Sequence, residues 1–119
     1  HPWRRLLELG GSVAIGTDSR ASNPDLSVFA ELQFLAERHP ESSHLDLLRL
    51  GTTNGRVAMT GCPGSPDALA NLTVIQVSDP RFRDPTRDLF APGNHVVGAM
   101  ISGRWVHSAI GTESITLTT

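Results

Sequence analysis

The stretch that decides the fold is Ser12-Val13-Ala14-Ile15-Gly16, followed at once by the polar residues Thr17, Asp18 and Ser19. A short, almost continuously apolar run of this kind is typical of a strand buried on both faces of a parallel sheet. Asp18 then stands at the carboxyl end of the strand, where the loops of a β/α barrel gather catalytic groups. A carboxylate at that place can bind a metal ion and accept a proton from water, or it can simply cap a turn.

Helices are predicted on both sides of this strand. Apolar residues at helical spacing favour a helix from Trp3 to Leu9, which Gly10-Gly11 ends because glycine accepts the left-handed conformation of a helix C-cap. Asn23-Pro24-Asp25 has the features of a helix start, so a second helix is predicted from there to Arg38, before His39-Pro40. The order helix, strand, polar loop, helix indicates an α/β succession, whose strand needs parallel neighbours that these residues do not supply.

The remaining residues divide into a helical connection, 40–61, and a β segment, 62–119. Ser43 and Asp46 have the spacing of a capping box, and the helix that they open is interrupted at Gly51 before a second short helix continues to Met59. In the β segment, residues 72–77 are a strand candidate, and 96–101 with 104–108 predict a hairpin around Ser102-Gly103. The connection 78–94 shows no periodicity, and the tail 111–119 either adds a strand or frays.

Composition excludes several classes of function. A net charge of −2 argues against a general binder of nucleic acid or anionic membranes, which needs a basic stripe. No apolar run approaches the length of a transmembrane helix. Cys62 is the only cysteine, so neither an intrachain disulfide nor a cysteine zinc cluster can form. A single free thiol fits a reducing compartment, and we expect a cytoplasmic protein.

Four short motifs follow one another along the chain. They are Gly16-Thr17-Asp18-Ser19 with Ala21-Ser22-Asn23, then Leu48–Met59 (LRLGTTNGRVAM), Ala70–Ile75 (ANLTVI) and Met100–Val106 (MISGRWV). In this order they resemble the phrases G-T-D-S-x-A-S-N, L-R-x-A-T-x-N-G-A-x-A-L, A-D-L-V-V-I and V-x-V-D-G-x-x-V of the amidohydrolase superfamily. The branch that they resemble holds cytosine and guanine deaminases, chlorohydrolases and adenosylhomocysteine-type deaminases. The chain departs from the third phrase at Asn71, where the family has aspartate, and lacks a lysine that precedes it.

The resemblance implies the C-terminal piece of a metal-dependent (β/α)8 hydrolase. Residues 1–39 would be the last β/α unit of the barrel, 40–61 a helical connection, and 62–119 part of a small β domain with the hairpin 96–108. Asp18 matches the family's aspartate, which binds the metal, helps activate its water and shuttles the proton to the leaving group. The intact enzyme would use a divalent zinc or iron ion to hydrolyse a C–N bond. Its substrate would be a cyclic amidine, such as a purine, a pyrimidine or a related heterocycle.

Other candidate residues are better explained by structure. The histidines are expected to be solvated or in the core, and the two tryptophans to pack. Ser19 and Ser22 are expected to form loop hydrogen bonds, since no G-x-S-x-G elbow is present. Alternating arginines and aspartates in 79–88 indicate a solvated, ion-paired loop. The residues concerned are His1, His39, His44, His95, His107, Trp3, Trp105, Arg81, Arg83, Arg87, Asp79, Asp84 and Asp88.

An alternative remains open at this point. The chain could be a self-standing α+β binding or assembly module that has lost the chemistry. If the chain is instead a piece of the hydrolase, its partners are the rest of its own barrel and β domain and a small heterocyclic substrate. A homo-oligomer is also compatible with this interpretation. Binding to nucleic acid or to a membrane is not expected. By itself the chain is then expected to be inactive and to hold no metal, because one aspartate is not a metal site.

Overall fold

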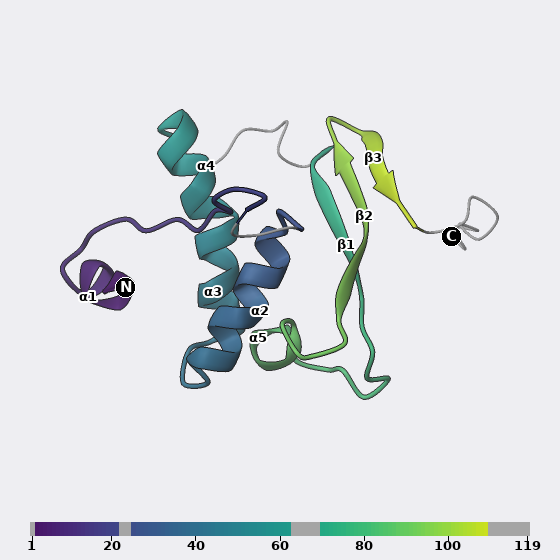
Figure 1. Ribbon diagram of the computed structural model, residues 1–119, viewed down its shortest axis with the longest axis horizontal. Helices are drawn as coiled ribbons and strands as arrows, with labels where there is room; N and C mark the ends of the chain where they lie inside the picture. The colour runs from purple at the N-terminus through teal and green to yellow at the C-terminus, as the bar shows by residue number, and fades with distance from the viewer. Residues whose placement is uncertain (1, 22–24, 63–69, 110–119) are drawn as a thin grey trace.

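The computed structural model describes residues 2–21, 25–62 and 70–109. The helices are α1 (Trp3–Glu8), α2 (Val28–Arg38), α3 (His44–Gly51), α4 (Thr53–Thr60) and α5 (Pro85–Asp88), and the strands are β1 (Leu72–Gln76), β2 (His95–Ile101) and β3 (Arg104–Ser108). Figure 1 shows α2, α3 and α4 on one side of the molecule and the three strands on the other, with α1 set apart. The predicted cap at Asn23-Pro24, the loop 63–67, the tail 111–119 and His1 lie outside the described residues.

Helix α1 ends where the glycine pair predicts. Gly10 adopts a φ of +79°, its N–H donates to Leu7 O at 2.9 Å, and the Gly11 N–H donates to Leu6 O at 2.8 Å. This pair of bonds is a Schellman motif, which satisfies carbonyls that the helix end leaves without partners. The helix is held to the turn before α3 by an ion pair from Arg4 to Glu41 and by the edge-to-face contact of the Trp3 ring with His39.

The prediction of a strand over 12–16 is wrong for this chain by itself, since residues 11–19 form neither helix nor strand. The physical reason is that a strand needs a neighbour, and no strand among the described residues lies beside this segment. The expected alternation is nevertheless present, because Val13, Ile15 and Thr17 are half-buried while the residues between them are exposed. This period of two is typical of an extended chain with one face packed.

Helix α2 starts later than the sequence predicts. Ser27 is its N-cap, with its Oγ accepting a hydrogen bond from the Ala30 N–H at 3.2 Å, and Leu26 has a φ of +46°, which no helix contains. The predicted start at Pro24 is therefore corrected to Val28. The predicted end is confirmed, because His39 is the C-cap and its N–H donates to Leu35 O at 2.8 Å.

The connection 40–61 contains the two helices that the sequence predicts. Ser43 caps α3, but its Oγ accepts from the Leu45 N–H, and Asp46 pairs with Arg49 at 2.8 Å instead of closing the capping box. Thr52 separates α3 from α4. Helix α4 ends at Gly61 in the left-handed conformation, with a φ of +71°.

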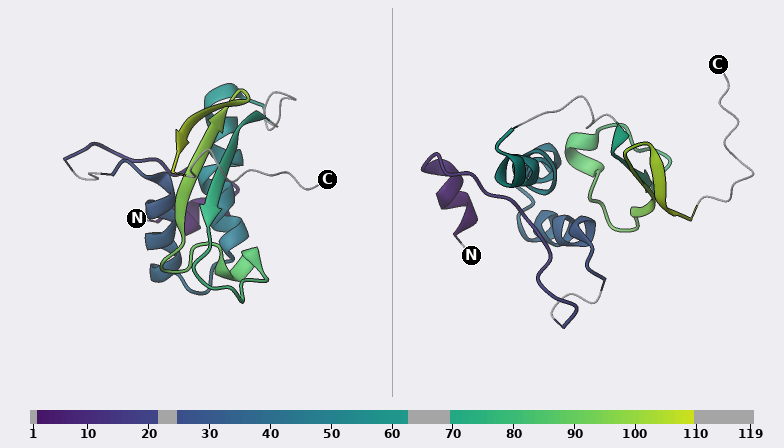
Figure 2. Two further views of the ribbon diagram at one scale, coloured as in Figure 1. Left: turned by 90° about the vertical axis from the view of Figure 1, so that its right-hand side faces the viewer. Right: turned by 90° about the horizontal axis from the view of Figure 1, so that it is seen from above.

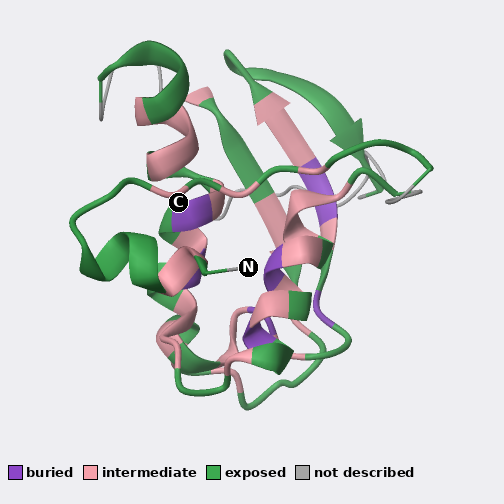
Figure 3. Ribbon diagram, turned by 60° about the vertical axis from the view of Figure 1, so that its left-hand side comes forward, coloured by how far each residue is buried: buried purple, intermediate pink, exposed green. Residues whose placement is uncertain are grey.

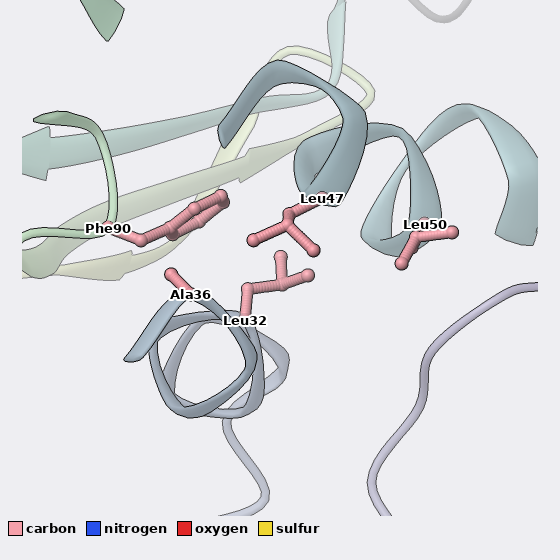
Figure 4. Packing of buried hydrophobic residues seen from close by; sticks show 5 residues of the cluster. All are labelled: Leu32, Ala36, Leu47, Leu50 and Phe90. Atoms are coloured by element: carbon pink, nitrogen blue, oxygen red, sulfur yellow. The ribbon is translucent and has the colours of Figure 1, made fainter. Parts of the chain in front are cut away.

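The core lies between α2, α3 and the residues that follow α5. The buried apolar side chains of Leu32, Ala36, Leu47, Leu50 and Phe90 meet there (Figure 4). Gly51 lets the two helices approach closely, since a Cβ on it would lie 2.7 Å from Leu32 Cδ1. Figure 3 shows how few residues of the chain are buried compared with those that are exposed or half-buried.

The three strands form an antiparallel sheet in the order β1-β2-β3. The predicted hairpin is confirmed, with Ile101 opposite Arg104 and positive φ values of +50° at Ser102 and +75° at Gly103. Two central residues with positive φ are the mark of a type I′ turn. The mixed α/β composition is thus confirmed, whereas the assignments of residues 1–39, 40–61 and 62–119 to barrel, connection and β domain remain predictions.

Helix α5 is a feature that sequence reasoning missed in the connection 78–94. Asp84 is its N-cap, with Oδ1 accepting from the Thr86 N–H at 2.9 Å, and Pro85 occupies its first turn. Asp84-Pro85 is therefore an N-cap followed by a proline in the first turn. The same pattern predicts a helix start at Asn23-Pro24. A four-residue helix carries no periodicity that could have confirmed it.

We expect Gly103→Ala to destabilise the chain by about 1 kcal/mol, because an L side chain in the left-handed region is strained. Gly55 is the matched control. An added Cβ would meet no atom within 4 Å at Gly55 or at Gly103, but Gly55 lies inside α4 and has no positive φ. Gly55→Ala should stabilise by a few tenths to about 1 kcal/mol through helix propensity. Urea unfolding midpoints measure both changes, and equal effects at the two glycines would contradict the turn assignment.

Candidate functional site

Asp18 is exposed and directly follows the segment 13–17, in which every second residue is half-buried. The segment is tied to the helices on one side, where the Ile15 N–H donates to Leu50 O at 3.0 Å and Asn54 Nδ2 donates to Val13 O at 2.8 Å. The described residues that follow, 18–21, stand out from the body of the molecule (Figure 2, left). The structure therefore places Asp18 just beyond an anchored, extended segment, on the surface.

The described residues do not assemble a metal site around Asp18. No group of three histidine, cysteine, aspartate or glutamate side chains lies close enough to hold an ion in residues 2–21, 25–62 and 70–109. Catalytic zinc is held by three protein ligands as a rule. Asp18 can supply one of them, so a complete site would need ligands that these residues do not offer.

His44 is a half-buried residue with a structural role. Its Nδ1 accepts a hydrogen bond from the Phe90 N–H at 3.0 Å, and its ring lies 5.4 Å from the Phe90 ring. Burial lowers the pKa of His44, opposed by the charge of Asp88. A neutral imidazole is what this bond requires, because a protonated Nδ1 cannot accept.

The other described histidines also fit the structural interpretation. The His39 ring meets Trp3 edge-to-face with centroids 5.3 Å apart, and His95 Nδ1 lies 3.1 Å from Gly93 O. His107 is exposed on β3. Trp3 packs as predicted, and Trp105 lies over Gly98, where an added Cβ would approach its ring to 2.9 Å.

The loop 79–88 contains an ion pair, as its sequence predicts, and a helix cap at Asp84, which its sequence analysis did not predict. Arg81 Nε lies 3.2 Å from Asp79 Oδ1, and the pKa of Asp79 is lowered chiefly by the backbone N–H of Arg81. The pKa of Asp84 is lowered chiefly by the hydroxyl of Thr86, which donates to it at 2.6 Å. The guanidinium of Arg83 donates to backbone carbonyls, at Pro80 and Phe82. These contacts stabilise the loop and do not form a phosphate clamp.

Asn94 is the polar residue that sequence reasoning missed. It is 3% exposed, and its Nδ2 donates to Asp88 O and Leu89 O, both at 3.0 Å. Its Oδ1 accepts from the Ser78 N–H at 3.0 Å and from the Ser78 hydroxyl at 3.2 Å. Asn94 thus joins the end of α5 to the exit of β1 and the start of β2. No sequence signal marks it, because an asparagine after Pro92-Gly93 has the pattern of an ordinary turn.

Large apolar side chains remain exposed on the helices and on the sheet. The exposed fractions are 88% for Met59, 67% for Leu9, 60% for Val106, 57% for Ile101 and 52% for Leu72. Contiguous apolar surface on a soluble protein generally marks a place that other protein covers. Separately, no helix among the described residues has the length and apolar character needed to cross a membrane.

Sequence comparison finds relatives that bear one name, 5-methylthioadenosine/S-adenosylhomocysteine deaminase. The protein of Syntrophobacter fumaroxidans is 34% identical over 92% of this chain, that of Thermotoga maritima 30% over 89%, and that of Nitratidesulfovibrio vulgaris 32% over 82%. The chain spans only 26%, 29% and 24% of their respective lengths. No family model matches the chain, and no solved structure matches it.

Proposed function

Because the chain is a relative of the 5-methylthioadenosine/S-adenosylhomocysteine deaminases, as its four motifs predicted, we propose that it is part of a deaminase that hydrolyses a C–N bond. The substrate class is a cyclic amidine. The relatives' names, 5-methylthioadenosine/S-adenosylhomocysteine deaminase, support a substrate that carries an adenine ring. The observation that carries the proposal is the position of Asp18 directly after the anchored segment 13–17, within the motif Gly16-Thr17-Asp18-Ser19.

In the proposed enzyme, residues 12–16 are the last strand of a (β/α)8 barrel and pair with strands of the longer protein. The alternation of half-buried Val13, Ile15 and Thr17 with exposed Ala14 and Gly16 supports this. One face of the segment already packs against helices, as in a barrel strand, and the other face is open to receive the barrel interior. The exposed Leu72, Ile101 and Val106 would be covered by further strands of the β domain.

Asp18 is proposed to bind a divalent metal, zinc or iron, and to move a proton. The metal, when bound, polarises water and so provides a nucleophile at neutral pH. No three candidate ligands lie together among the described residues, so in this proposal the ligands that join Asp18 come from the longer protein. The carboxylate accepts the proton of the attacking water and passes it to the departing nitrogen, which is general acid–base catalysis.

Metal content tests this proposal against the alternative of a self-standing module. The 119-residue chain should retain far less than one zinc or iron per molecule, whereas the full-length protein should hold about one, because only the latter has a full ligand set. Elemental analysis of both proteins, purified without chelators, measures this. About one tightly bound ion per isolated chain would contradict the proposal and point to a site shared between chains, for instance through His95 or His107. A metal-free, active full-length protein would also contradict it.

A further inference from the structure

We propose that His44 is a pH-sensitive switch, which joins the helices to the segment before β2 at neutral pH and releases this contact in mild acid. The observation that carries the proposal is one bond between distant parts of the chain. His44 Nδ1 accepts a hydrogen bond from the Phe90 N–H at 3.0 Å, across a sequence separation of 46 residues. His44 is the first residue of α3, whereas Phe90 follows α5 in the connection to β2. The bond therefore links the helical part of the chain to the segment that enters the sheet.

Only the neutral imidazole ring can make this bond. A ring whose Nδ1 accepts carries its proton on Nε2, and protonation places a second N–H on Nδ1. Two donors would then face each other at the distance of a hydrogen bond. The Phe90 ring is 3% exposed, points into the core cluster (Figure 4) and lies between the rings of His44 and Phe29, with centroids 5.4 Å and 5.3 Å away. Protonation of His44 therefore removes a hydrogen bond from a packed aromatic contact.

The surroundings of the ring favour its neutral form. Burial lowers the pKa of His44, and the charge of Asp88 opposes this effect. As the first residue of α3, His44 also lies at the positive end of the helix dipole, which disfavours a cation. The other charged residues around the ring border the same hollows or share its helical turn, and they are Glu37, Glu41, Asp46 and Arg87.

The direction of the pH effect follows from the lowered pKa of His44. Histidine in an unfolded chain has a pKa of about 6.5, so on acidification the unfolded chain takes up this proton before the folded chain does. The contribution of neutral His44 to stability is therefore complete above about pH 6.5 and is lost as the pH falls below that value.

Acid is expected to loosen this junction without unfolding it, because other bonds there do not titrate. Asn94 Nδ2 donates to the two backbone carbonyls directly before Phe90. Gln33 of α2 donates to Asn94 O at 2.9 Å and to Ala91 O at 3.2 Å. Neither amide side chain changes its charge with pH. Protonation of His44 thus releases the contact with α3 and leaves the contacts with β2 and α2 in place.

Amide hydrogen exchange in the full-length protein tests the switch without an assay of activity. The strand pairing proposed for residues 12–16 involves neither His44 nor Phe90, so we expect the same contact in the longer protein. With rates corrected for the intrinsic pH dependence of exchange, protection of the Phe90 amide should fall roughly 2- to 10-fold between about pH 7.5 and about pH 5, the factor that corresponds to one hydrogen bond. Protection in the hairpin 96–108 should stay the same.

His44→Asn is the matched variant, because asparagine offers an acceptor oxygen near the position of Nδ1 and does not titrate. It should keep the protection of the Phe90 amide at neutral pH and lose the pH dependence. His44→Phe keeps a ring without an acceptor, so it should show low protection at both pH values, also if the asparagine variant does not fold. Asp88→Asn should move the loss of protection to lower pH, because the Asp88 charge favours the protonated ring. His107→Asn, at an exposed histidine on β3, should behave like the unchanged protein.

Two results would overturn the inference. Constant protection of the Phe90 amide between the two pH values would show that the His44 ring does not release it in acid. A pH dependence that persists in His44→Asn or His44→Phe would assign the effect to another titrating group. The inference does not depend on the proposed function, since the exchange pattern is the same whether or not the longer protein is a deaminase.

Discussion

Asp18→Asn in the full-length protein is expected to lower kcat by at least about 100-fold, because losing a general acid–base group typically costs 100- to 10,000-fold. Asparagine keeps the size and shape of the side chain but cannot accept the proton of water at neutral pH. Weaker polarisation by a less well held metal adds to the loss. The thermal midpoint should change little, since Asp18 is exposed. Steady-state kinetics with an adenosine thioether, together with metal content, measure the effect.

Asp25→Asn is the matched control for this experiment. Asp25 lies in the same loop and is exposed, and it precedes the Ser27 cap of α2, so its charge contributes at most about 0.3–1 kcal/mol to that helix end. Its removal should leave kcat almost unchanged. If Asp18→Asn retained more than about a tenth of the activity with metal bound, Asp18 would be a turn residue, because loss of a general base costs more.

Asn94→Leu is expected to lower the free energy of unfolding of the chain by about 3 kcal/mol or more. The substitution removes the four hydrogen bonds of a side chain that is 3% exposed, to the N–H and hydroxyl of Ser78 and to the carbonyls of Asp88 and Leu89. Each hydrogen bond contributes roughly 0.5–1.5 kcal/mol, so the four together account for about 3 kcal/mol or more. Urea unfolding, followed by the fluorescence of Trp3 and Trp105, measures the change.

Asn71→Leu provides the comparison for Asn94. Asn71 is exposed and its Oδ1 accepts one bond, from the Ser102 N–H at 2.7 Å. Water can replace that partner, so the cost should stay near 0.5–1.5 kcal/mol. Equal losses at the two positions would mean that Asn94 does not organise the contact between α5, β1 and β2.

Local signals in the sequence were sufficient for those features that local energetics determine. Gly10-Gly11 ends a helix because the left-handed conformation needs no partner from elsewhere in the chain. Ser102-Gly103 forms a tight turn for the same reason. The end of α2 at His39-Pro40 follows from the conformational restriction that proline imposes on the preceding residue.

Features that depend on distant residues could not be predicted. The run 12–16 has the composition of a strand, but its conformation depends on neighbours, and here its edge is satisfied by Leu50 and Asn54. The Asn94 side chain makes four hydrogen bonds, to Ser78, Asp88 and Leu89. The sequence does not indicate these partners, because the connection 78–94 has no periodicity. The first turn of α2 was misplaced because two caps compete, and Ser27 prevails over the earlier signal.

The candidate site was predictable from motif resemblance alone. Asp18 stands in a polar loop, and neither its exposure nor the composition around it separates it from an ordinary turn residue. The relatives confirm the resemblance, and the structure adds what the motifs did not contain, the two anchors at Val13 and Ile15.

The most direct test of the account is a crystal structure of the full-length protein with its metal bound. The account predicts an Asp18 carboxylate oxygen at about 2.0–2.2 Å from the ion, the distance of a zinc–carboxylate bond. It also predicts residues 12–16 as a strand with parallel neighbours. A metal centre built from other residues, with Asp18 turned to solvent and 12–16 unpaired, would contradict the assignment of residues 1–39 to the last β/α unit of a deaminase barrel.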